Sequence, residues 1–73
     1  EFDLAELTIG LGMEHSEYEP EQFPGVQYKP PENQGLFLIF RTGKVILTGV
    51  DEEKAAKSSF SVLRKRLNEI GAI

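Results

Sequence analysis

The sequence of 73 residues has no cysteine and no tryptophan, and it contains a single histidine. Without cysteine the chain has neither a disulfide framework nor thiolate metal ligands, and one histidine does not make a zinc site. No Ser/His/Asp set, carboxylate dyad or phosphate-cradling loop is present, so we expect no enzyme activity, no cofactor and no metal. The lack of cysteine also fits a reducing interior such as the cytoplasm.

Positive charge and long apolar runs are also scarce. The chain has 8 Lys and Arg against 12 Asp and Glu, a net charge of −4, which argues against a protein that coats nucleic-acid phosphates by bulk charge. No apolar run approaches the roughly 20 residues of a membrane span, and the first residues do not resemble a signal peptide. We therefore expect one small soluble domain with no membrane partner.

The first half of the chain predicts a short helix followed by extended segments. Asp3 is a good N-cap and Gly12 stands where a left-handed C-terminal residue belongs, which predicts a helix over residues 3–11. The apolar stripe of this helix is Leu4, Leu7 and Leu11. The other elements predicted here are a short edge strand at 15–19, a corner at 20–25, an extended segment at 26–29 and a proline-broken loop at 29–35.

The second half predicts a hairpin and a longer helix. The hairpin has strands at 36–40 and 44–48 joined by a turn at Thr42 and Gly43. Asp51 is predicted to cap a helix that carries Glu52 and Glu53 in its first turn and ends at Gly71. The predicted apolar stripe of this helix is Ala56, Phe60, Leu63, Leu67 and Ile70. The element order predicts an α+β fold, an antiparallel sheet with two helices on one face.

Both faces of the predicted hairpin are apolar. Because strand side chains alternate between faces, one face consists of Phe37, Ile39, Val45 and Leu47. The other consists of Leu36, Leu38, Phe40 and Ile46, with Lys44 and Thr48 at its margins. Two helices can cover only one face, and a contiguous uncovered apolar face marks a binding surface. Packing of that face against a second copy or a subdomain stays open as the alternative.

A second apolar feature is the stretch SEYEPEQFPG, residues 16–25, which places Phe-Pro-Gly directly after several carboxylates. A buried phenylalanine needs no proline and glycine beside it to hold it at a bend. We therefore expect an exposed corner that carries a large apolar group at the edge of the uncovered face.

Two blocks, YEPEQFPG at 18–25 and LIFRTGKVILTG at 38–49, together resemble one repeat of the TATA-box-binding protein family, in particular the archaeal kind. The resemblance covers residues 4–70. It implies a half-saddle, with both helices on the convex face of the sheet. We expect residues 1–73 to be a single repeat, the second of a two-repeat protein, without the opening strand that is central to the family's saddle.

The resemblance implies a general transcription initiation factor that binds and bends TATA-box DNA through the minor groove. In this family two phenylalanines per repeat wedge between base steps, and here they match Phe23 and Phe40. The other implied contacts are Pro24, Leu38, Ile46 and Thr48 with sugars and base edges, and Lys29, Thr42 and Lys44 with phosphates.

The resemblance also implies partners. Glu19, Glu21 and Gln22 match the loop that docks transcription factor B, although simple solvation would also explain them. Completing the saddle requires a second repeat or a homodimer partner. Because strand 44–48 would have an unpaired edge, we expect this chain alone to form a homodimer or larger assembly. We expect it to bind DNA weakly, because the groove-reading residues of the absent strand are missing. The implied location is the cytoplasm and nucleoid of an archaeon, or the nucleus of a eukaryote.

Two alternatives to this function stay open. One is a helix-backed sheet domain whose apolar face mediates dimerisation or protein binding, and the other is a saddle-like module appended to a nucleic-acid enzyme. The basic run Arg64-Lys65-Arg66 could contact a regulator or nucleic acid, but the outer members of such a run more often form a solvated helix face.

Overall fold

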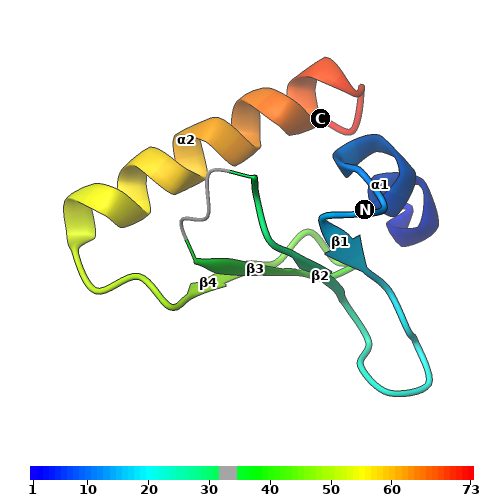
Figure 1. Cartoon of the computed structure of the whole chain (residues 1–73). Coiled ribbons are helices and arrows are strands. Elements are labelled where there is room, and N and C mark those ends of the chain that lie inside the picture. Colours follow the sequence, from blue (N-terminus) through cyan, green and yellow to red (C-terminus); the bar gives the residue numbers. More distant parts are fainter. Residues whose placement is uncertain (32–34) are drawn as a thin grey trace.

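The computed structural model describes residues 1–31 and 35–73, which form one antiparallel sheet with two helices on the same side (Figure 1). The elements are α1 (Leu4–Leu11), β1 (Ser16–Glu17), β2 (Val26–Tyr28), β3 (Leu36–Ile39), β4 (Val45–Thr48) and α2 (Glu53–Glu69). The sheet order is β1-β2-β3-β4, and each strand is antiparallel to the next. The predicted fold class and element order are confirmed, while the centre of the loop predicted at 29–35 lies outside the described residues.

The first helix begins and ends where the sequence predicts. The Asp3 carboxylate accepts a hydrogen bond from the Glu6 backbone N–H at 3.2 Å. At the other end Gly12 has a φ of 106°, in the region that favours glycine, and its N–H donates to the Thr8 carbonyl oxygen. The Ser16 hydroxyl lies within hydrogen-bond distance of the Thr8 and Gly12 carbonyl oxygens, at 3.1 and 2.7 Å. These contacts tie the end of α1 to β1.

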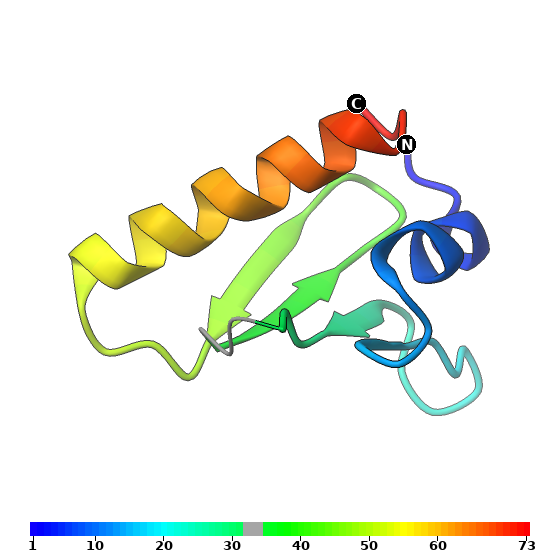
Figure 2. The same ribbon diagram turned by 45° about the horizontal axis from the view of Figure 1, so that its top comes forward.

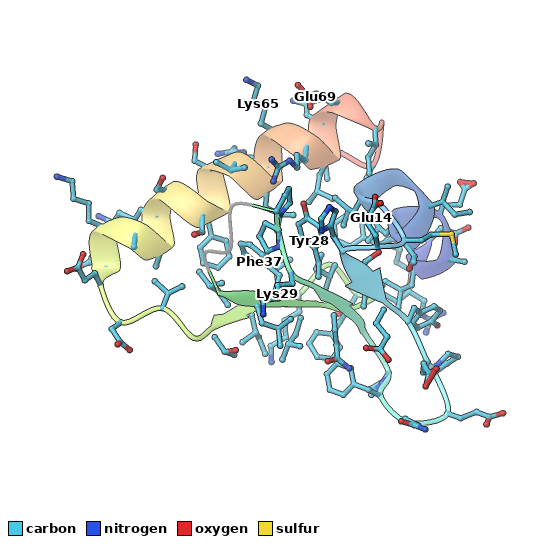
Figure 3. The ribbon with its side chains drawn as sticks, in the orientation of Figure 1. Glu14, Tyr28, Lys29, Phe37, Lys65 and Glu69 are labelled. Carbon is cyan, nitrogen blue, oxygen red and sulfur yellow. The ribbon has the colours of Figure 1, made fainter. Side chains whose placement is uncertain are left out.

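The hydrophobic core lies between the sheet and the two helices. The sheet contributes four side chains with no more than 1% of their surface exposed: Val26, Tyr28, Phe37 and Ile39. Tyr28 and Phe37 lie between the strands and α2 (Figure 3). The helices contribute Leu4, Leu7, Leu11, Leu63 and Leu67. Both helices lie on the same side of the sheet (Figure 2), so the core occupies that side only.

The second helix starts later than predicted. Its N-cap is Glu52 and not Asp51, because the Ala56 N–H donates to the Glu52 carbonyl oxygen, at 3.0 Å, and residue 52 itself is extended. The Glu52 side chain makes no capping hydrogen bond. No helix in the described part of the chain has the length and apolar character that crossing a membrane requires.

The buried stripe of α2 is also narrower than predicted. Leu63 and Leu67 are buried, as expected, but Phe60 and Ile70 are 41% and 39% exposed. Ser59 is buried in their place, since the helix approaches the sheet along the line of residues 59, 63 and 67. Phe60 lies beside that line, and its ring meets the edge of the Phe37 ring at 5.4 Å between centroids.

The basic run on α2 is divided between solvent and the core. Arg64 and Lys65 are exposed, and Lys65 points away from the sheet (Figure 3). Arg66 is half-buried, and its guanidinium donates a hydrogen bond to the hydroxyl of Tyr28 at 3.2 Å. The expectation of a solvated side chain therefore holds for Arg64 and is wrong for Arg66.

The unequal burial of α2 residues gives a stability test. We expect Leu63→Ala to lower the free energy of unfolding by about 2–5 kcal/mol, because it removes a side chain that is fully packed. Phe60→Ala should cost less, since much of its ring is exposed in the folded protein. Urea denaturation of both variants measures the difference. An equal or larger loss in Phe60→Ala would contradict the described packing of α2.

Candidate nucleic-acid interface

The side of the sheet opposite the helices presents a continuous row of apolar side chains. Since strand residues alternate between faces, the neighbours of the buried Phe37 and Ile39 point away from the helices. The register pairs Leu38 with Ile46 and Leu36 with Thr48, and cross-strand partners share a face. We define the open face as Gln27, Leu36, Leu38, Phe40, Ile46 and Thr48.

None of the six residues of the open face carries an ionisable side chain, but Lys44, which lies opposite Phe40 and two residues before Ile46, stands at the margin of that face. Leu36, Leu38 and Phe40 are half-buried by their neighbours in the sheet, whereas Ile46 and Thr48 are exposed. In both views of the ribbon the helices lie on the other side (Figures 1 and 2). The open face predicted for the hairpin is therefore present, and it is a contiguous apolar surface of the kind that binds a partner.

Two phenylalanines that are distant in sequence meet at one end of the open face. Phe23 comes from the loop between β1 and β2, and Phe40 directly follows β3. Their rings are tilted by 55° with centroids 5.6 Å apart, within the range of a favourable aromatic contact. We call them the ring pair. The predicted exposed corner is present at Pro24, which is exposed, but Phe23 is half-buried because the Phe40 ring lies against it.

Positively charged side chains border the ring pair. A hollow of about 350 Å³ is lined by Pro24, Phe40, Arg41, Thr42 and Lys44. The turn is fixed by two hydrogen bonds, from Phe40 N to the Lys44 carbonyl oxygen and from Gly43 N to the Phe40 carbonyl oxygen, both 2.9 Å. Thr42 and Lys44 were predicted from the sequence, but Arg41 was missed. The sequence does contain a signal for Arg41 as a phosphate contact, because Arg41 directly follows Phe40 in a turn that also contains Lys44.

The third residue predicted to approach phosphates lies elsewhere. Lys29 directly follows β2, whose last residue pairs with Phe37, so it lies at the opposite end of the sheet from Phe40. Its backbone N–H donates to the His15 carbonyl oxygen at 2.7 Å, and its side chain is exposed. The structure therefore groups Thr42 and Lys44 with the ring pair and separates Lys29 from them.

The three residues predicted to dock a partner form a compact corner next to the ring pair. The backbone N–H groups of Gln22 and Phe23 both donate to the Glu19 carbonyl oxygen, at 2.9 Å. The side chains of Glu19, Glu21 and Gln22 are all exposed. No lysine or arginine precedes Lys29 in the chain, so the carboxylates of this corner have no lysine or arginine beside them in sequence.

Comparison with known proteins identifies the family. The family model described as "Transcription factor TFIID (or TATA-binding protein, TBP)" matches residues 1–70. The chain belongs to the TATA-binding protein family. It is similar to TATA-box-binding protein C of Halobacterium salinarum, with 42% identity over 67 residues, which are 92% of this chain and 37% of the relative. The TATA-box-binding protein of Thermoplasma volcanium is 40% identical over 73 residues, which are 100% of this chain and 40% of that protein.

A solved structure confirms the fold. The structure of Methanococcus jannaschii TBP matches 96% of this chain with a TM-score of 0.85 and 36% sequence identity. The predicted TATA-box-binding-protein-like arrangement of sheet and helices is therefore confirmed. The match covers 40% of the solved chain, so the chain spans well under half the length of the relatives it matches.

Proposed function

We propose that this chain forms part of the DNA-binding surface of a general transcription initiation factor and acts without enzymatic chemistry, in the compartment that holds the DNA. The observation that supports this most strongly is the open face: a largely apolar sheet surface with the ring pair at one end. Relatives named as TATA-box-binding proteins cover the whole chain, which favours TATA-box DNA as the ligand.

The chemistry of the open face fits the minor groove better than the major groove. The major groove presents a distinct pattern of donors and acceptors at each base pair, which an apolar surface cannot read. The minor groove has a degenerate pattern, and proteins that bind it insert apolar side chains between base steps and kink the duplex. We assign the wedge role to Phe23 and Phe40. The adjoining contacts with sugars and base edges are assigned to Pro24, Leu38, Ile46 and Thr48.

The negative charge of the chain is compatible with this function. When apolar side chains are inserted into the minor groove, affinity comes largely from apolar burial and from the energetics of DNA deformation. Such binding does not require a uniformly basic surface. Phosphate contacts need only local cations and hydroxyls. We assign them to Thr42 and Lys44 beside the ring pair, with Arg41 added from the structure, and to Lys29 at the other end of the sheet.

The sheet edge at β4 offers a way to enlarge the DNA-binding surface. Within the described residues β4 is the last strand of the sheet, and an edge strand has backbone groups that can pair with a further strand. We propose that either a second repeat or a second copy of the chain pairs there and extends the open face. An extended face would contact more of the DNA than these four strands can.

The wedge role is tested by replacing Phe23 and Phe40 with alanine, singly and together, in the full-length protein. Each substitution should weaken binding to a TATA-box duplex by about tenfold, since an aromatic side chain stacked on a base contributes on the order of 1–3 kcal/mol. Band shifts measure the affinity, and energy transfer between dyes at the duplex ends measures bending.

Phe60→Ala is the matched control, because it removes an exposed phenylalanine from the helix-covered side. It should leave both binding and bending unchanged. If the double variant Phe23→Ala, Phe40→Ala binds and bends the duplex as the Phe60→Ala control does, the proposed DNA-binding role of the open face is wrong.

The acidic corner is proposed to dock transcription factor B. Glu19 and Glu21 project from a corner next to the ring pair, where a partner could contact protein and DNA together. We expect Glu19→Lys with Glu21→Lys not to weaken DNA binding and to weaken the ternary complex several-fold, because charge reversal at an interface rim opposes association. Titration of the factor onto the preformed protein–DNA complex measures this.

The control for charge is Glu53→Lys with Glu69→Lys, which makes the same net change on α2. Both side chains are exposed, and Glu69 points away from the sheet (Figure 3). Equal weakening of the ternary complex by both pairs of substitutions would show that overall charge, and not the corner, is responsible.

A further inference from the structure

Gly25 occupies a position with no room for a side chain. The residue is buried, and it is not one of the glycines with positive φ, so its backbone conformation does not require glycine. A Cβ atom placed on Gly25 would lie 2.8 Å from the Ile39 carbonyl oxygen, and 3.1 and 3.2 Å from the Cδ1 and Cε1 atoms of Phe40. The space that a side chain would need is therefore filled by a strand carbonyl and by the edge of the Phe40 ring.

The Phe40 ring is thus in contact with one tripeptide at two places. It lies against the backbone of Gly25 and against the ring of Phe23, two residues earlier. Pro24 connects these two contacts and restricts the backbone between them, because its ring fixes φ. Directly after Gly25, Val26 pairs with Ile39 in the sheet. The contact between Gly25 and Phe40 is consequently anchored in the β2–β3 pairing and not in a free loop.

We propose that Gly25 is a positioning residue for DNA binding: by having no side chain, it allows the Phe40 ring to take the place from which it enters the duplex. This inference rests on the proposed function of the ring pair. Any side chain at residue 25 would push the Phe40 ring from its rotamer and alter its contact with Phe23, since overpacked side chains move to strained conformations. A wedge must align with a base step, so a displaced ring should bind DNA less well.

The test is Gly25→Ala in the full-length protein, combined with Phe40→Ala in a double-mutant cycle. Gly25→Ala should weaken binding to a TATA-box duplex by about tenfold and reduce the bend, which is the effect expected of one overpacked contact. In the Phe40→Ala background the same substitution should have a much smaller effect on affinity, because only the contact with the Ile39 carbonyl oxygen remains. Non-additivity of this kind shows that Gly25 acts through the ring of Phe40.

Gly71→Ala is the control for a general loss of stability. Gly71 has a φ of 80°, where alanine is strained, but an added Cβ there would have no atom within 4 Å. It directly follows the C-cap of α2 and takes no part in the open face. We expect this variant to unfold at a lower temperature while the folded protein binds and bends the duplex normally.

Two outcomes of the binding and folding measurements would overturn the inference. One is an equal loss of affinity on Gly25→Ala whether or not Phe40 is present, because Gly25 would then act through the Ile39 backbone. The other arises if Gly25→Ala does not fold and the double variant Gly25→Ala, Phe40→Ala does not fold either. A double variant that folds and binds like Phe40→Ala alone supports the inference.

A readout without DNA separates this inference from the proposed function. In the free protein, nuclear Overhauser contacts between the rings of Phe23 and Phe40 should be present, should be lost or weakened in Gly25→Ala, and should persist in Gly71→Ala. If these contacts behave as expected but the unsubstituted protein does not bind the duplex, the proposed function is wrong while the packing role of Gly25 stands. Unchanged ring contacts in Gly25→Ala would overturn the positioning role itself.

Discussion

Packing of the helices against one side of the sheet is the constraint on which the rest of the structure depends. Phe37 and Ile39 are completely buried beneath the helices, and this fixes the orientation of β3. Because the side-chain period of a strand is two, Leu36, Leu38 and the following Phe40 must then face the other way. A shift of one residue in the β3 register would exchange the core with the open face. The core therefore determines the candidate interface without contributing an atom to it.

The ring pair also shows how two half-buried aromatic side chains can hold each other in place at the end of a sheet face. Phe23 and Phe40 bury part of each other's surface, and Gly25 provides the space for this contact. A side chain that is already ordered loses less conformational entropy on binding than a mobile one, which favours affinity. The cations Arg41 and Lys44 adjoin the same hollow. One end of the sheet thus combines the ring pair with two positively charged side chains.

Features that depend on local chemistry could be predicted from the sequence. The caps of α1 at Asp3 and Gly12, the separation of the two hairpin faces and the turn at Gly43 follow from residue preferences within a few positions. The family could also be recognised from its two blocks. The burial of α2 was harder, because a helical period locates the apolar stripe only approximately. Ser59 and Phe60 are adjacent, and only the packing against Phe37 decides which of them is buried.

Contacts between distant residues were beyond the reach of the sequence pattern. The bond from Arg66 to Tyr28 and the packing of Phe23 on Phe40 join segments that come together only in the folded chain. For the same reason the sequence predicts an exposed corner at 20–25, although Gly25 is buried against the Phe40 ring. The separation of Lys29 from Thr42 and Lys44 likewise follows from strand register, which single residues do not reveal.

The most direct test of the open face as the DNA-binding surface is methyl NMR of the full-length protein during titration with a TATA-box duplex. Ile46 lies on the open face and is 36% exposed, whereas Ile9 lies on α1 and is 69% exposed, so exposure alone favours a response at Ile9. We expect the Ile46 methyl signals to shift and to show intermolecular Overhauser contacts with the DNA, while the Ile9 signals stay unchanged. DNA contacts at Ile9 with none at Ile46 would contradict the assignment of the open face.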